Sequence, residues 1–291
     1  MAKRPKKRSK FDSWIRVVRW ANTLTAMFCV YIAFTFGTET PSPIEWVIVM
    51  MSVGLIFAGG NALNDYLDAE TDKISHPERP IPSGGLKRKS VRDVGIILIS
   101  AGSATAIAGA LFHGILPSAI AVSAAAILTL YNLYLKRIPL LGNLTIAILG
   151  GAVFIYAGAA QGLAVGHYYA ACFAFLFHVS REIIKDISDL PGDESAGIFT
   201  LPSKIGVKKS SKIAVALLLF IVPLSIVPYF DKTFSLWYLG AVILFVDLPI
   251  SLFAWIIPQS TAPRQSMKIA GDLKWIMLGG LFSLLIGGLT S

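Results

Sequence analysis

The chain has 291 residues, of which 55% are hydrophobic and only 15% are charged, and its mean hydropathy is +0.66. This composition is too apolar for an ordinary soluble domain. The net charge of +9 would suit a nucleic-acid-binding protein as well as a membrane protein, so the position of the basic residues decides between these partners.

Nine apolar stretches are each long enough to cross a bilayer, which takes about 20 residues. Several are rich in Gly, Ala and Ser, as between Ser100 and Ala110, which favours close packing of helices in lipid. The sequence predicts an all-α integral membrane protein with one domain over residues 1–291. The nine stretches lie at about 20–37, 44–63, 93–112, 116–135, 140–162, 166–184, 212–230, 235–257 and 271–290.

The basic residues gather on one side of this nine-span arrangement. That side holds 25 of the 26 Lys and Arg residues, and only Lys232 falls on the other. The positive-inside rule therefore predicts a multi-pass protein of the cell membrane with a cytoplasmic N-terminus and a C-terminus on the opposite side. We interpret the basic segment 1–19 as a topology anchor that touches anionic lipid, rather than as a nucleic-acid arm.

A cleaved signal peptide is a weaker interpretation of the same N-terminal segment. No small-residue cleavage site ends the first apolar stretch, and Trp14 and Trp20 suit a membrane interface. Cys29 and Cys172 both lie within apolar stretches, where free cysteines behave as small hydrophobic residues, so neither a disulfide nor a metal site is expected there.

Two long cytoplasmic connections, 64–92 and 185–211, carry the same acidic pattern. Each contains the spacing D-x-x-D-x-x-x-D, and the two copies are offset by 121 residues. We expect chemistry on the cytoplasmic face, with these connections as active-site loops, and a parallel internal repeat. The first cluster consists of Asp65, Asp68 and Asp72, and the second of Asp186, Asp189 and Asp193.

The spacing predicts three carboxylates on one stripe of a helix, because positions i, i+3 and i+7 share a face. Asn64 joins the first stripe, whereas Pro191-Gly192 is expected to break the second helix before Asp193. Carboxylates gathered in this way need cations, and oxygen ligands suit Mg²⁺, which is usually held by one or two carboxylates plus substrate phosphates. A solvated acidic loop is the plainer alternative for one cluster and a weaker one for two copies.

Five cations lie next to the clusters or at the cytoplasmic end of the fourth apolar stretch. Each alone would suit an interfacial anchor, but beside six carboxylates they favour a site for a Mg²⁺-bridged diphosphate, where cations neutralise the leaving group. The five are Arg79, Lys136, Arg137, Arg181 and Lys185.

A diphosphate bound at a membrane-embedded site implies a lipid chain attached to it. Heterolysis of an allylic C–O bond leaves a carbocation, which the rings of Tyr131 and Tyr134 could stabilise by cation–π contact. Ordinary packing or an interfacial position is the alternative for both tyrosines.

At these residues the chain resembles the UbiA superfamily of intramembrane prenyltransferases. The resemblance covers nearly the whole chain, through the span count, the orientation, N-D-x-x-D-x-x-x-D at Asn64–Asp72, its partner at Asp186–Asp193 and a Tyr/Lys motif at Tyr131–Lys136. It implies a bundle of nine transmembrane helices around a central cavity. The Tyr/Lys motif can be aligned with either Tyr131 or Tyr134 as the family tyrosine.

The resemblance also implies roles for individual residues. The metal ligands it implies are Asn64, Asp68, Asp72, Asp189 and Asp193. Asp186, which belongs to the same cluster as the last two, is added to this predicted set. The catalytic residues we expect are Asp65, Asp68, Asp186, Tyr131 and Lys136. The substrate-binding residues we expect are Asn22, Arg79, Lys136, Arg137, Arg181 and Lys185.

The strings around His76–Gly84 and Arg181–Asp193 resemble most the archaeal ether-lipid branch of the superfamily. That branch transfers a geranylgeranyl group from its diphosphate to the free hydroxyl of geranylgeranylglyceryl phosphate. A phosphate-bearing lipid acceptor would need further cations to bind its phosphate. Candidates are Lys73, Lys185, Lys204, Lys208 and Lys209.

Two alternatives remain. Within the superfamily, the acceptor could be an aromatic quinone precursor such as 4-hydroxybenzoate. A cation or metabolite transporter is the alternative from another class, but transporters place such carboxylates near the bilayer midplane, where this chain has only Asp247. The expected partners are thus the prenyl diphosphate, a lipid acceptor, Mg²⁺ and membrane lipids, without nucleic acid or an obligate protein partner.

Overall fold

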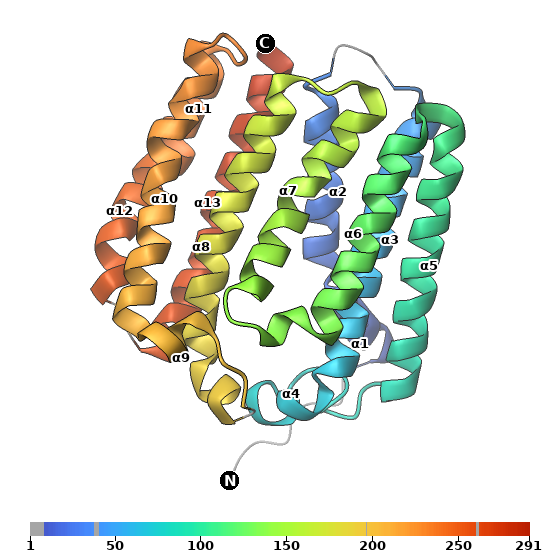
Figure 1. Cartoon of the computed structure of the whole chain (residues 1–291), viewed down its shortest axis with the longest axis vertical. Helices are drawn as coiled ribbons and strands as arrows, with labels where there is room; N and C mark the ends of the chain where they lie inside the picture. Colours follow the sequence, from blue (N-terminus) through green and yellow to red (C-terminus); the bar gives the residue numbers. More distant parts are fainter. Residues whose placement is uncertain (1–8, 38–40, 196, 260–261) are drawn as a thin grey trace. The chain divides into compact units, whose positions relative to one another are not determined.

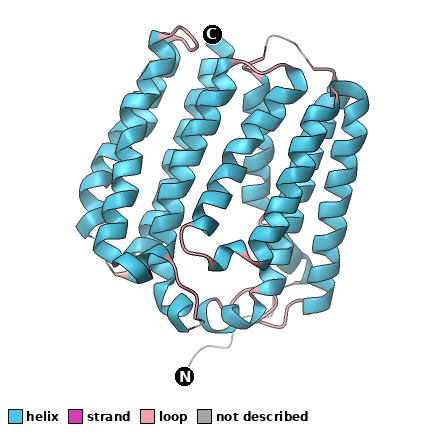
Figure 2. Ribbon diagram, viewed as in Figure 1, coloured by secondary structure: helices cyan, strands magenta, loops and turns pink. Residues whose placement is uncertain are grey.

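The structure is a computed structural model that describes residues 9–37, 41–195, 197–259 and 262–291, the side chains of residues 74 and 75 excepted. Throughout these ranges the regular elements are helices, and no strand occurs (Figure 2). The expected all-α class is confirmed. The chain divides into two compact units, which are Met1–Phe28 with Pro41–Tyr134, and Cys29–Thr40 with Leu135–Ser291.

The first unit is built around the packing of α3 on α5. Helix α3 begins at a capping box in which Ser42 and Glu45 satisfy each other's backbone donors, with Pro43 in the first turn. The two helices approach closely, since a Cβ added at Gly59 or Gly102 would lie 2.8 Å from atoms of the other helix. The helices of this unit are α1 (Lys10–Val17), the first part of α2 (Trp20–Phe34), α3 (Pro43–Leu67), α4 (Ala69–Ser75), α5 (Arg88–His113) and α6 (Ile115–Leu133).

The second unit is organised around its longest helix, α8, which contacts α7, α10 and α13 (Figure 1). A π-helical turn joins α11 to α12. The elements are η1 (Leu135–Arg137), α7 (Leu141–Gln161), α8 (Val165–Ser195), α9 (Leu201–Ile205), α10 (Val207–Phe230), α11 (Leu236–Val242), η2 (Ile243–Asp247), α12 (Leu248–Ile256), η3 (Ile257–Gln259) and α13 (Pro263–Thr290).

Seven helical segments among the described residues are long and apolar enough to cross a membrane. The pair α1 and α2, bent by 44°, makes an eighth if it counts as one span. Helix α8 covers the sixth apolar stretch but carries His167, His178 and Arg181, which lower its hydropathy. The chain is thus a multi-pass membrane protein, while the count of nine spans stays a prediction.

The two connections expected as active-site loops are largely helical. Residues 64–92 include α4 and the start of α5, and residues 185–211 include the end of α8 and all of α9. The expectation that Pro191-Gly192 breaks the helix is wrong, because α8 continues to Ser195. Proline removes a single backbone donor, and the neighbouring turns keep theirs.

Candidate active site

The first acidic cluster lies at the junction of α3 and α4. Asp65 is in the last turn of α3, Asp68 caps that helix, and Asp72 is in the first turn of α4. The backbone bonds Asp68 N–H to Asn64 (2.9 Å) and Asp72 N–H to Asp68 (2.8 Å) carry the helical i to i−4 pattern through the junction. The predicted stripe therefore survives the break, and the Asn64 amide donates to the Asp68 carboxylate.

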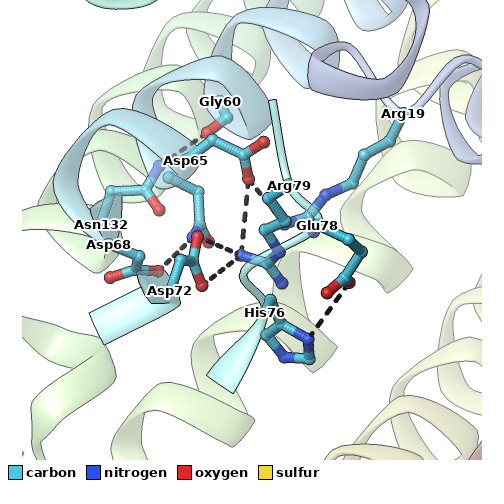
Figure 3. A network of polar contacts seen from close by, with 10 residues as sticks. Arg19, Gly60, Asp65, Asp68, Asp72, His76, Glu78, Arg79 and Asn132 are labelled. Carbon is cyan, nitrogen blue, oxygen red and sulfur yellow. Dashed lines mark hydrogen bonds and ion pairs between the residues drawn. The ribbon is translucent and has the colours of Figure 1, made fainter. Parts of the chain in front are cut away.

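Arg79 joins two of these carboxylates (Figure 3). One of its terminal nitrogens lies 2.9 and 2.8 Å from the two Asp72 oxygens and 3.6 Å from Asp65 Oδ1. The sequence predicted that Arg79 binds substrate phosphate, and the structure places its guanidinium against Asp72 and Asp65. A charge-assisted contact of this kind fixes the orientation of the arginine head group.

Burial acts on the charge of this cluster. The side chain of Asp72 is only 6% exposed, and this burial raises its pKa, while the Arg79 guanidinium opposes the shift. A divalent cation placed beside the carboxylate would favour the ionised form further, because it adds positive charge.

Sequence reasoning missed two residues of this network. Arg19 donates to Asp65 Oδ1 at 3.3 Å, and Asn132, which is buried, donates to the Gly60 carbonyl at 3.0 Å (Figure 3). An amide within an apolar helix was the available signal for Asn132. Nothing local marked Arg19, since its partner lies 46 residues away.

The second acidic cluster lies on one continuous helix, α8. Asp186 accepts a hydrogen bond of 2.8 Å from the amide of Asn143 on α7, and Asp189 accepts one of 3.1 Å from Ser188. Burial outweighs the opposing effect of the Asn143 donor and raises the pKa of Asp186 to about 7. Asn143 was another residue that the sequence analysis did not single out.

Two of the predicted phosphate-binding cations, Arg181 and Lys185, lie against an acid on their own helix. Arg181 donates to Glu182 Oε1 at 3.1 Å, and Lys185 Nζ lies 3.3 Å from Glu182 Oε2. Glu182 is 8% exposed, and a buried carboxylate needs such partners. Lys73 has a similar contact with Glu70 at 2.6 Å, on the exposed surface of α4.

The other predicted site residues lie on α2, on α6 and its end, and on η1, α9 and α10. In the first unit, Tyr131 on α6 is half-buried, while Tyr134, just after that helix, is 64% exposed. Asn22 is exposed on α2. In the second unit, Lys136 and Arg137 lie on the 3₁₀ turn η1. The other candidate lysines for an acceptor phosphate are Lys204 on α9 and Lys208 and Lys209 at the start of α10.

The donor groups of both clusters suit Mg²⁺ in kind, since they are carboxylate and amide oxygens. Over the described ranges, no three His, Cys, Asp or Glu side chains lie close enough to hold a metal ion by themselves. Mg²⁺ does not need such a cage, because it usually takes one or two carboxylates and completes its coordination with water and substrate phosphate. The residues present fit this mode of binding.

Comparison with known proteins places the chain in a family. The model of the UbiA prenyltransferase family matches residues 25–277. The digeranylgeranylglyceryl phosphate synthase of Methanoculleus marisnigri is 36% identical over 87% of this chain and 88% of its own length. That of Methanoregula boonei is 34% identical over 94% of this chain and 96% of its own length.

Solved structures give the same family fold. A digeranylgeranylglyceryl phosphate synthase structure has a TM-score of 0.76 at 30% identity, covering 96% of this chain and 99% of its own. A UbiA homologue from Archaeoglobus fulgidus, bound to DMAPP and Mg²⁺, has a TM-score of 0.66 at 18% identity, covering 94% and 99%. The chain belongs to the UbiA prenyltransferase family. It is an enzyme of the membrane that transfers prenyl groups.

Proposed function

We propose that this enzyme transfers a geranylgeranyl group from geranylgeranyl diphosphate to the free hydroxyl of geranylgeranylglyceryl phosphate, with Mg²⁺ as cofactor. The similarity that carries this proposal is to relatives named for that product, which align over 87% and 94% of the chain. The carboxylate and arginine network of Asp65, Asp72 and Arg79 gives the chemistry for holding a metal diphosphate.

We propose that both acidic clusters bind the metal diphosphate. Bound Mg²⁺ would neutralise the charge that develops on the leaving diphosphate. The cations assigned to the phosphate oxygens are Arg79, Lys136 and Arg137, with Asn22, Arg181 and Lys185 as further substrate-binding residues. The proposed metal ligands are Asn64, Asp68, Asp72, Asp186, Asp189 and Asp193.

The reaction breaks the allylic C–O bond of the donor and forms a new C–O bond to the acceptor. The diphosphate leaves with the bonding electron pair, and the acceptor hydroxyl loses its proton. A cluster carboxylate, with Asp65 and Asp186 as candidates, or the released diphosphate can take that proton. Tyr131, half-buried on α6, is our candidate for cation–π stabilisation of the allylic cation.

We further propose that the whole chain acts as one prenyltransferase domain of nine spans around a central cavity. The family match at 25–277 runs through both compact units. The charge distribution, with 25 of 26 Lys and Arg residues on one side, supports a cytoplasmic N-terminus and active site. Labelling of single cysteines introduced at either end of the chain in intact cells tests this orientation.

The test of the activity uses purified protein with Mg²⁺ and geranylgeranyl diphosphate. The acceptors are geranylgeranylglyceryl phosphate and, separately, 4-hydroxybenzoate, and products are identified by mass spectrometry. We expect the doubly geranylgeranylated glyceryl phosphate. Prenylation of the aromatic acid alone would instead assign the protein to the quinone branch, and cation-driven uptake without any prenyl product would indicate a transporter.

A further inference from the structure

Helix α1 is attached to the first unit by more than its charge. Val17 at the end of α1 is fully buried and packs with Ala62 of α3 and Val91 of α5, and Trp14 lies against the same cluster. Ser13 is buried as well, close to Gly85. A segment that served only as a lipid anchor would not need these contacts, so α1 has a fixed position within the unit.

The backbone at the end of α1 has an unusual conformation. Arg19, between α1 and α2, has a φ of +47°, a region that residues other than Gly and Asn rarely adopt. Its carbonyl accepts the Thr23 N–H at 3.0 Å and its own N–H donates to the Arg16 carbonyl at 3.1 Å. An arginine at a position where glycine would be easier points to a role for its side chain.

The side chain of Arg19 reaches a carboxylate of the first acidic cluster. It lies 3.3 Å from Asp65 Oδ1, while Arg79 approaches the same oxygen at 3.6 Å (Figure 3). Asp65 is only 7% exposed, so it needs a nearby positive charge. Because Arg19 supplies one, Arg79 can keep its shorter contacts, of 2.8 and 2.9 Å, with Asp72.

An arginine within α1 holds the segment that carries Arg79. Arg16 donates to the carbonyl of Glu78 at 3.1 Å. Glu78 directly precedes Arg79, so this bond fixes the backbone from which the Arg79 side chain extends. Helix α1 and the short connection after it thus contact the network at two points, through Arg16 beside Arg79 and through Arg19 on Asp65.

We propose that Arg19, supported by Arg16, is a positioning residue for metal and diphosphate binding. It provides the counter-ion for Asp65, and Arg79 thereby keeps its contact with Asp72. This inference rests on the proposed function and adds to it a role for the basic N-terminal segment, which the sequence predicted to be a topology anchor.

The test measures ligand binding rather than turnover. Isothermal titration calorimetry on the solubilised full chain, with Mg²⁺ and geranylgeranyl S-thiolodiphosphate as an unreactive donor analogue, compares the native protein with Arg19→Gly. Glycine accepts the positive φ, which offsets part of the stability lost with one of the two arginines of Asp65, so the melting temperature should fall only slightly. We expect the Kd of the analogue to increase about tenfold or more, as for other residues that orient metal ligands.

Two matched variants separate positioning from charge alone. Lys10→Ala removes a cation from the exposed start of α1, the helix that precedes Arg19, and should leave the Kd unchanged. Arg19→Lys keeps the charge without the guanidinium fork and should give an intermediate Kd. Equal losses from Lys10→Ala and Arg19→Gly would mean that α1 acts as a general basic anchor, and would overturn the proposal.

Binding of the analogue to the native chain separates failure of the positioning role from failure of the proposed function. If the native chain binds the analogue and Arg19→Gly binds it as tightly, the positioning role is wrong and the proposed function stands. If the native chain does not bind it, the proposed function fails and the inference fails with it. If Arg19→Gly is too unstable for titration, Arg19→Gln decides by the same Kd comparison, since it keeps much of the side chain without the charge.

Discussion

The two acidic clusters have identical spacing but different surroundings. In the first, the carboxylates lie at a helix junction, and two arginines from other segments, Arg79 and Arg19, contact Asp65. In the second, the carboxylates follow one another along α8, where Asp186 accepts from the Asn143 amide and Asp189 from the Ser188 hydroxyl. The repeat thus specifies where the carboxylates lie, and the neighbouring segments specify how their charge is compensated.

This difference suggests separate tasks for the two copies. The first cluster couples its carboxylates to Arg79, a cation that suits phosphate oxygens. In the second, the flanking cations Arg181 and Lys185 lie against Glu182, which restricts where their side chains can reach. We expect ligand binding at the first cluster to weaken when a cation is lost, and metal binding at the second cluster to weaken when a hydrogen-bond donor is lost.

Removing a carboxylate from either cluster should have the largest effect. Asp68→Ala and Asp189→Ala should each abolish transfer of the geranylgeranyl group, because each takes away an oxygen ligand for the metal diphosphate. Product formation in purified membranes measures this, and helical content by circular dichroism checks the fold. Near-native activity in both folded variants would remove the clusters from the site.

Loss of Arg79 should break the first cluster without affecting the second. Arg79→Ala leaves Asp72, which is 6% exposed, without its guanidinium, and leaves Asp65, which is 7% exposed, with Arg19 alone. Removing the guanidinium beside these carboxylates should destabilise the first unit by about 2–3 kcal/mol, less than the usual cost of breaking a fully buried pair, because Arg79 is itself 25% exposed and Asp65 keeps Arg19. Thermal unfolding in detergent measures the change.

The matched variant for that prediction is Arg79→Lys. It keeps the charge and should recover most of the stability, but less of the donor binding, because lysine lacks the guanidinium geometry. If Arg79→Ala unfolds at the native temperature and binds donor normally, the network around Asp65 and Asp72 has no role.

Metal binding by the second cluster should depend on the amide of Asn143. Asn143→Ala removes the donor to Asp186 and should raise the Mg²⁺ concentration for half-maximal rate roughly tenfold. Asn143→Asp places a like charge beside Asp186 and should raise the required Mg²⁺ concentration further. Titration of the rate with Mg²⁺ measures both, and an aspartate variant as active as the alanine variant would argue against the contact.

The smallest effect is expected at Ser188. The Ser188 hydroxyl lies 3.1 Å from Asp189 Oδ1 but donates over a shorter distance, 2.6 Å, to the Lys185 carbonyl, so Ser188→Ala takes only a weak contact from Asp189. The rate at saturating Mg²⁺ should fall by a few-fold at most. A loss as large as that of Asp189→Ala would show that the hydroxyl takes part directly in the reaction.

Local features of this fold were predictable from the sequence. The helix period placed Asn64, Asp68 and Asp72 on one stripe, and the backbone bonds confirm that pattern through the junction. The Gly, Ala and Ser residues near Gly102 predicted close packing, which α3 and α5 show. Such features depend on neighbours within a few turns, and the sequence displays them directly.

Features that depend on distant partners were not predictable in the same way. The contact of Arg19 with Asp65 joins residues 46 apart, and that of Asn143 with Asp186 joins residues 43 apart. The prediction of a break at Pro191 failed because a proline rule considers one lost hydrogen bond and not the turns on either side. A charge pattern shows that Arg79 is near acids, but only the fold shows which ones it contacts.

Metal dependence of product formation tests the central claim most directly. Purified native protein receives geranylgeranyl diphosphate and geranylgeranylglyceryl phosphate, and the product is followed by mass spectrometry before and after chelation and on adding Mg²⁺ back. The doubly geranylgeranylated product should disappear with the chelator and return with Mg²⁺. Product formed at an unchanged rate without a divalent cation would contradict the account of the two acidic clusters.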